Sequence, residues 1–240
     1  MLHSYSFYNF CTLQNMQIYI DEAGRGPLAW PLAIGLVEII HPHKRDKLIT
    51  DSKKLSPKQR DLAYDMIQTY IKTWDVKATV VLMSPKNIDT RGMTRTLREG
   101  ILQWVKKLSP SNKEIHLIID GHTDFGLRKV TSWEVETIIH GDALVPEIGM
   151  ASILAKVERD RLMERLDKKY PQYQFAKHKW YGTQLHRDLI AQHGPCEIHR
   201  KLFLKDYFPE QNRDFWDKKS KVAKQTPPTF GHLPLSGETE

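Results

Sequence analysis

Three apolar stretches of this chain end in acidic residues, and this feature restricts its possible folds and functions most strongly. Runs of Ile, Val and Leu of this length, bounded by turn residues, are typical of buried β-strands. The stretches and their acids are 17–21 with Asp21 and Glu22, 115–120 with Asp120, and 135–142 with Asp142. Two more apolar runs, 32–40 and 76–83, predict further strands.

A helix is predicted to begin directly after residue 56. Ser56 is a suitable N-cap, Pro57 suits the first helical position, and Gln59 completes a capping box. We expect this helix to end near Trp74. The apolar residues at one-turn spacing, which predict its buried face, are Leu62, Met66 and Tyr70.

Two longer helical patterns follow the third and the fifth predicted strands. One runs from about Pro85 to Leu108, with Gly92 as its weak point. The other is expected over Pro146 to Lys169, before Pro171. Its predicted buried stripe consists of Ile153, Val157, Leu162 and Leu166.

The order of these elements predicts the fold class α/β. The first strands follow one another closely and are expected to pair antiparallel, whereas later strands alternate with helices, so the sheet is mixed and flanked by helices. After residue 150 the pattern contains only helices and loops. The predicted divisions are an N-terminal extension (1–16), a core (17–150), a helical C-terminal region (151–211) and a polar tail (212–240).

The composition favours a cytoplasmic protein with a polyanionic partner. Lys and Arg number 36 against 29 Asp and Glu, a net charge of +7, and neutralising phosphates with such groups releases counterions. The two cysteines have neither disulfide-framework nor zinc spacing. No apolar run approaches the roughly 18 residues needed to cross a bilayer, and no secretory signal pattern is present at the start.

The acids at the strand ends predict a metal site. Each one alone could be a turn former or a residue favoured near a helix N-terminus. Together they would repel one another unless a cation neutralises them, and Mg²⁺ prefers oxygen ligands. Two such ions roughly 4 Å apart can stabilise the attacking and leaving oxygens of phosphodiester hydrolysis.

Six segments of the chain resemble the ribonuclease HII family in order and spacing, over about residues 17–205. They are IDEAGRGPLAWPLAIG (20–35), DSKKLS (51–56), IIDG (118–121), GDALVPEIGMASILAKVERDRLM (141–163), FAKHKWYGTQLHRD (175–188) and GPCEIHRKLF (194–203). The resemblance implies a ribonuclease H-like mixed sheet flanked by helices, followed by a helical C-terminal portion that packs over the substrate.

The resemblance also implies an activity and a catalytic site. Asp21, Glu22, Asp120 and Asp142 match the acids that hold Mg²⁺ or Mn²⁺ in a two-metal site. The expected enzyme is a monomer that cuts RNA in RNA–DNA hybrids and at ribonucleotides embedded in duplex DNA, leaving 5′-phosphate and 3′-hydroxyl ends. Such an activity belongs to DNA replication and repair.

The same resemblance assigns substrate-binding residues. The turn Gly24-Arg25-Gly26 and Tyr181 would read the ribonucleotide where RNA meets DNA, because backbone amides can bond a 2′-hydroxyl. Contacts with phosphates are implied for Ser52, Lys53 and chiefly Lys54, and for Lys156 in the helix 146–169. By residue type alone, these are also an ordinary glycine turn, a solvated basic loop and a surface lysine. His178 and His199 are interpreted as structural.

The chain departs from the family pattern at several positions. Trp30 and Trp180 stand where glycine is usual, and Gly149-Met150 replaces two small alanines. Because Trp180 precedes Tyr181, we expect it to affect substrate preference more than hydrolysis.

Two other functions fit parts of the pattern. Another ribonuclease H-like nuclease, such as a resolvase, would also use clustered acids, but the Gly24–Gly26 turn and Tyr181 favour a site that reads ribose. A nucleic-acid-binding protein without catalysis is disfavoured, because a binder of polyanions gains nothing from four convergent negative charges.

Overall fold

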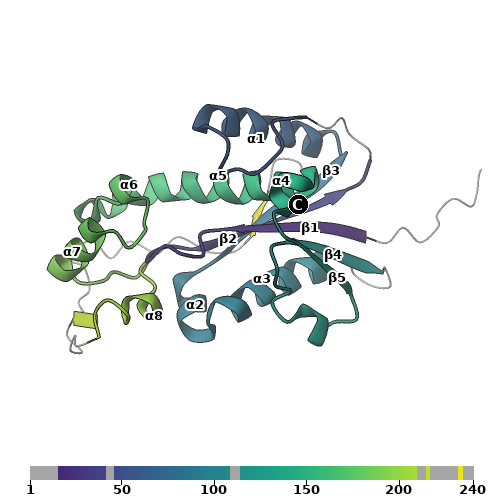
Figure 1. Cartoon of the computed structure of the whole chain (residues 1–240). Helices are drawn as coiled ribbons and strands as arrows, with labels where there is room; N and C mark the ends of the chain where they lie inside the picture. The colour runs from purple at the N-terminus through teal and green to yellow at the C-terminus, as the bar shows by residue number, and fades with distance from the viewer. Residues whose placement is uncertain (1–15, 42–45, 109–113, 210–214, 217–231, 235–240) are drawn as a thin grey trace, which may run out of the picture.

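The computed structural model describes residues 16–41, 46–108, 114–209, 215–216 and 232–234, which form a mixed sheet with helices on both faces (Figure 1). The strand order is β5-β4-β1-β2-β3-β6. Strands β1, β2 and β3 pair antiparallel, as do β3 and β6, whereas β1, β4 and β5 run parallel. The strands are β1 (Met16–Ala23), β2 (Leu32–Ile39), β3 (Val76–Met83), β4 (Ile115–Asp120), β5 (Glu134–Ile138) and β6 (His232–Pro234).

The helices form a layer on each face of the sheet and a group at one end (Figure 1). The first layer comprises α1 (Pro57–Lys72), α4 (Gly141–Leu144) and α5 (Pro146–Lys169). The second comprises α2 (Pro85–Arg91) and α3 (Met93–Leu108). The end group contains α6 (Phe175–His178), α7 (Gln184–His193) and α8 (Lys201–Leu204), and the 3₁₀ turns are Leu127–Lys129 and Pro171–Tyr173.

Strand β2 lies at the centre of two apolar cores, one on each face of the sheet. Ala33 and Val37 belong to the core under α1 and α5, while Leu32, Ile34 and Leu36 belong to the core under α3. Successive side chains of a strand point to opposite faces, so a strand covered on both sides needs apolar residues at every position. This explains why 32–37 reads as an unbroken apolar run.

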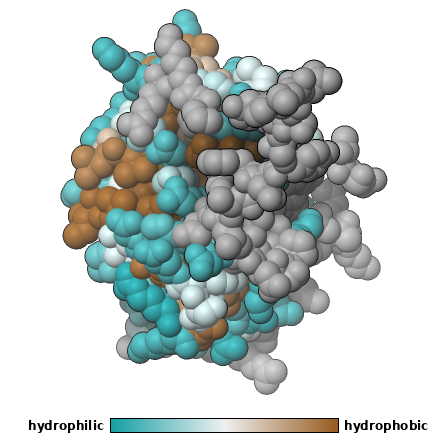
Figure 2. Space-filling view, turned by 90° about the vertical axis from the view of Figure 1, so that its right-hand side faces the viewer, coloured by the Kyte–Doolittle hydropathy of each residue, from teal (hydrophilic) through white to brown (hydrophobic). Residues whose placement is uncertain are grey.

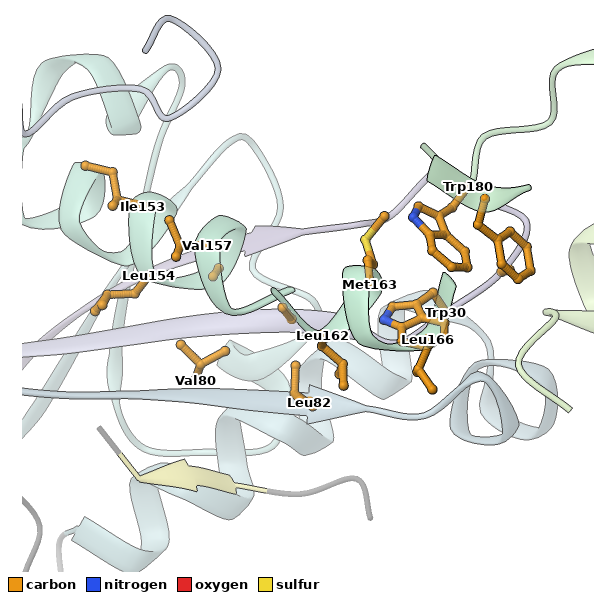
Figure 3. Close-up of a cluster of buried hydrophobic side chains, with 14 of the residues drawn as sticks. Trp30, Val80, Leu82, Ile153, Leu154, Val157, Leu162, Met163, Leu166 and Trp180 are labelled. Carbon is orange, nitrogen blue, oxygen red and sulfur yellow. The ribbon is translucent and has the colours of Figure 1, made fainter. Parts of the chain in front are cut away.

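Helix α5 crosses the sheet at close range, and its apolar stripe faces the strands (Figure 3). The predicted stripe of Ile153, Val157, Leu162 and Leu166 is buried, which confirms it. A Cβ placed on Gly35 of β2 would lie 2.2 Å from the carbonyl oxygen of Ala151. The missing side chain at Gly35 therefore permits the helix backbone to rest on the strand.

The structure corrects two of the three helical predictions. The helix expected over 85–108 is divided at Gly92, which has φ of 75° and follows the end of α2. The predicted face of α1 was wrong, because Leu62 is 50% exposed. The buried face is rotated by one residue to Ala63, Ile67 and Ile71, which share one core with α5.

The structure also differs from the prediction at the two ends of the sheet. The strand expected over 135–142 ends at Ile138, and Asp142 lies in the short helix α4 instead. The region after residue 150, expected to hold only helices and loops, contributes β6, and Phe215 is buried in the core under α5. Met16 begins β1 rather than ending the extension, whose residues 1–15 lie outside the described part. The predicted boundary at 150 falls within α5.

The surface mixes polar and apolar residues. Figure 2 shows a hydrophobic patch on the left of one face, bordered by hydrophilic residues. Among the helices that the structure describes, none has the length and apolar character needed to span a membrane.

We expect Gly35→Ala to destabilise the protein by about 1–3 kcal/mol, because the added methyl must push α5 away from β2. In a chain of this size, each kcal/mol lowers Tm by about 2–4 °C in thermal unfolding. Lys58→Ala at an exposed position of α1 is the control, and should change the stability by less than about 0.5 kcal/mol. A Gly35→Ala variant as stable as the wild type would contradict the close packing.

Candidate active site

Three carboxylates meet at one edge of the sheet. Asp21 lies near the end of β1, Asp120 ends the parallel neighbour β4, and Asp142 lies in α4. One oxygen from each lies within 4.8 Å of the others. Parallel neighbouring strands end at the same edge, so the apolar runs of β1 and β4 bring the first two acids together. The Asp142 N–H donates to Asp120 Oδ1 at 3.2 Å and links the third acid to them.

These carboxylates destabilise one another's charged forms. Burial raises the pKa of Asp21 to about 8, with further contributions from Glu22 and Asp120. Burial also raises the pKa of Asp142, to which Asp120 and Asp51 add. A hydrogen bond from Ser152 of α5 acts in the opposite direction on Asp21. An all-oxygen group of this kind fits a hard divalent cation, which would favour the ionised carboxylates.

Glu22, the fourth predicted acid, lies beside this group but outside the three-carboxylate cluster. Its Oε1 accepts from Arg25 Nη1 at 3.3 Å. Burial raises the pKa of Glu22, the Arg25 guanidinium opposes this shift, and Asp120 adds to it. Glu22 is therefore close enough to Asp120 to feel its charge while being neutralised by Arg25.

The loop before α1 brings a lysine and a further acid to the cluster. Burial would lower the pKa of Lys53, but the charges of Asp21, Asp142 and Asp51 outweigh it and raise this pKa overall. The charge of Lys53 thus interacts directly with the carboxylates. Asp51 begins the segment DSKKLS, but no role was predicted for it; its negative charge helps to raise the pKa of Asp142.

Two of the other side chains predicted to contact phosphates, those of Ser52 and Lys156, have internal partners in the structure. Ser52 is buried, and its Oγ bonds Ser152 Oγ at 3.0 Å, so it supports the residue that contacts Asp21. Lys156 Nζ donates to Asp160 at 2.7 Å. Lys54 is exposed in a turn, where its N–H donates to the carbonyl of Asp51 at 3.0 Å. Substrate contacts by all three stay predictions.

The Gly24–Gly26 turn directly follows β1 and lies next to Tyr181. Two observations favour glycine at position 24. Its φ is 94°, and a Cβ there would lie 2.2 Å from Nε of the buried Arg159. A Cβ on Gly26 would lie 3.7 Å from the Tyr181 ring. Tyr181 is 54% exposed. The structure therefore brings together the turn and the ring that the sequence assigned to ribose recognition.

The two unusual tryptophans occupy backbone conformations that favour glycine. Trp30 has φ of 98° and Trp180 of 73°. Both rings are buried, with centroids 5.0 Å apart, and Trp180 also stacks on Phe175 at 3.7 Å (Figure 3). Backbone strain of about 1–3 kcal/mol per residue is offset by burial of an indole, worth roughly 4–5 kcal/mol. The Trp180 ring thus packs inside the protein, while Tyr181 remains at the surface.

A mixed sheet that brings acids together beside a basic loop defines a ribonuclease H-type nuclease, a metal-dependent class of hydrolase. The family model described as Ribonuclease HII matches residues 18–206, most of the chain. The chain belongs to the ribonuclease HII family.

Known relatives agree with this assignment. Ribonuclease HII of Campylobacter jejuni is 38% identical over 186 residues, covering 78% of this chain and 89% of that protein. The corresponding protein of Sulfurovum is 39% identical over 184 residues, covering 77% and 89%. Among solved structures, ribonuclease H2 of Pyrococcus horikoshii has a TM-score of 0.60 at 25% identity, covering 82% and 100%. The ribonuclease HII of Archaeoglobus fulgidus, solved with PCNA, has the same fold, with a TM-score of 0.62 at 24% identity. The match covers 83% of this chain and 99% of that one.

We expect Asp21→Asn to stabilise the metal-free protein, and increasingly so as pH rises. The pKa of Asp21 is raised in the fold from 3.8 to about 8, so its protonated form favours folding and this contribution is lost between those pH values. At pH 8 with chelator the gain should be roughly 5 kcal/mol at most, since each of about four pKa units contributes about 1.4 kcal/mol. Thermal unfolding at pH 4 and 8 measures it, with the exposed Asp65→Asn as control. A gain that does not grow with pH would contradict the repulsion.

Proposed function

We propose that this ribonuclease H-type endonuclease hydrolyses RNA in RNA–DNA hybrids and at single ribonucleotides embedded in duplex DNA. The observation that carries the proposal is the position of the Gly24–Gly26 turn. It begins three residues after Asp21, on the same strand end as the carboxylates, and lies beside the exposed ring of Tyr181. A site that senses a 2′-hydroxyl therefore lies directly beside the group suited to cut the adjoining phosphodiester.

Mg²⁺ or Mn²⁺ is the proposed cofactor, because every candidate ligand is a carboxylate oxygen. Asp21, Asp120 and Asp142 would hold the ions, and Glu22 would complete the site from the Arg25 side. When bound, two such ions activate the attacking water and stabilise the leaving oxygen. The products would carry 5′-phosphate and 3′-hydroxyl ends.

The chain's own residues orient the substrate. Lys53, whose charge balances the carboxylates, would bind the phosphate at the site of cleavage. Backbone N–H groups of the Gly24–Gly26 turn would hydrogen-bond the 2′-hydroxyl of the ribonucleotide. The Tyr181 ring would stack on the next sugar and disfavour a 2′-hydroxyl there. All these residues come from one chain, so we propose that the enzyme acts as a monomer.

We expect the protein to cut a DNA duplex that carries one ribonucleotide on the 5′ side of that nucleotide. Cleavage should need Mg²⁺ or Mn²⁺ and stop with chelator. Loss of an outer-shell partner of a metal ligand costs about 10–100-fold, so Asp21→Asn, which removes a ligand, should lower the rate by more than about 100-fold. Duplex binding by this variant, measured by gel shift, should be largely retained.

An all-DNA duplex of the same sequence is the matched substrate control. Equal cleavage of both duplexes would indicate a general nuclease of the resolvase type. Binding of both duplexes without any cleavage would indicate a nucleic-acid-binding protein that has no catalytic activity.

We expect Tyr181→Ala to weaken the preference for the RNA-to-DNA junction by about tenfold, since stacking on an aromatic ring is worth about 1–3 kcal/mol. The measurement compares kcat/KM on the single-ribonucleotide duplex and on a long RNA–DNA hybrid. Trp74→Ala, which removes another exposed aromatic ring at the end of α1, is the control. An unchanged preference in Tyr181→Ala would remove the role proposed for this ring.

A further inference from the structure

Two adjacent buried residues, His199 and Arg200, connect to opposite walls of the proposed ribose-reading site. They lie in the loop between α7 and α8, far in sequence from the Gly24–Gly26 turn. Both are at most 1% exposed. His199 also forms an isolated bridge with Ala29.

The Arg200 guanidinium holds the turn through its carbonyl groups. All of its nitrogens donate to backbone oxygens: Nη2 to Gly24 at 2.6 Å, Nη1 to Arg25 at 2.8 Å and Pro27 at 3.0 Å, and Nε to Trp30 at 3.0 Å. In a trans peptide the N–H points opposite to the C=O. The N–H groups of Arg25 and Gly26 therefore point away from Arg200, on the side from which a ribose can approach.

An ion pair does not explain the burial of Arg200. Its described contacts include no salt bridge to a carboxylate. Among the nearby charges, that of Arg159 repels the Arg200 guanidinium and that of Asp89 attracts it. A buried cation is costly unless it is fully hydrogen-bonded, and here the turn carbonyls supply the acceptors. The shape of the turn and the burial of Arg200 thus depend on each other.

His199 reaches Tyr181 through a second histidine. His199 Nδ1 accepts from the Cys196 N–H at 3.0 Å, so the hydrogen of the neutral ring is on Nε2, which lies 3.2 Å from His186 Nε2. His186 Nε2 must then accept, and its Nδ1 carries the hydrogen donated to the Tyr181 carbonyl at 2.9 Å. Burial lowers the pKa of His186 to about 3, in keeping with neutral rings.

We propose that His199 and Arg200 are positioning residues that set the distance between the Gly24–Gly26 turn and Tyr181, and thereby the selectivity for ribonucleotide junctions. A backbone hydrogen bond from Leu28 N–H to the Trp180 carbonyl at 3.0 Å joins the same two segments. The inference rests on the proposed function, because it concerns how that site is held in register. It adds residues that touch no substrate and act through the turn and the ring.

Three substitutions separate the contacts. Arg200→Lys keeps a charge, but one ammonium cannot replace a guanidinium that reaches four carbonyls. His199→Asn keeps an acceptor for the Cys196 N–H and loses the donor to His186. His199→Gln keeps a donor near the Nε2 position. The controls are Arg165→Lys on the exposed side of α5 and His41→Asn at the sheet edge.

The measurement is the ratio of kcat/KM on the single-ribonucleotide duplex to that on a long RNA–DNA hybrid, corrected for the folded fraction from thermal unfolding. Displacement of a reacting group by about 1 Å can cost on the order of 100-fold. We expect Arg200→Lys and His199→Asn to lower the ratio by about tenfold or more, and His199→Gln to lower it less. Mn²⁺ affinity, measured by calorimetry, should change by less than about threefold.

A double-mutant cycle tests the route of each effect. In a Tyr181→Ala background, His199→Asn should cause no further loss of the ratio, because its effect passes through Tyr181. Arg200→Lys should still lower the ratio there, since it acts on the turn.

Equal losses on both substrates, or an effect of His199→Asn that is unchanged in the Tyr181→Ala background, would show a merely structural role and overturn the inference. If the wild type prefers the ribonucleotide duplex and all three variants keep that preference, this inference alone fails. If the wild type shows no such preference, the proposed function fails with it.

Discussion

The close contact between α5 and β2 at Gly35 is the constraint on which the site depends. Gly35 is the partner of Asp21 in the β1–β2 ladder, and the Ala151 carbonyl rests where its side chain would be. The next residue, Ser152, hydrogen-bonds Asp21. One turn earlier, Gly149 leaves room for the carbonyl of Asp142. A single helix, whose position depends on two glycines, therefore fixes two of the three clustered acids.

The candidate site is acidic, whereas the chain as a whole is basic. The chain carries a net +7, yet it gathers carboxylates whose pKa values are raised by burial and by mutual repulsion. Lys53 and Arg25 balance part of this charge from the side. A phosphate backbone drawn to the basic surface would be repelled at the cluster itself unless cations were bound there. Under the proposed function, metal binding and substrate binding at this edge of the sheet would therefore be coupled.

Much of the fold and of the acidic cluster could be predicted from the sequence. Asp21 and Asp120 end apolar runs, and the sheet makes these runs parallel neighbours, in keeping with the sheet that the family resemblance implied. Asp142 was expected at a strand end, but it lies in the short helix α4. A helix of four residues is too short to leave a recognisable periodic pattern in the sequence. The prediction that Leu62 is buried was wrong, because packing against α5 determines which face of α1 is buried. Asp51, His186 and Arg200 matter through contacts between distant segments, which no local pattern contains.

The short strand β6 has a consequence for the solubility of the folded chain. Strand β3 is buried at nearly every position, and without a neighbour on its outer side it would offer unpaired amides and carbonyls to other molecules. An exposed apolar edge of this kind is a template for intermolecular sheets. Strand β6 pairs with it from Thr79 to Val81 and ends in Pro234, a residue that suits an outermost strand because it has no N–H to donate. Strand β6 thus shields this part of the sheet edge from pairing with other molecules.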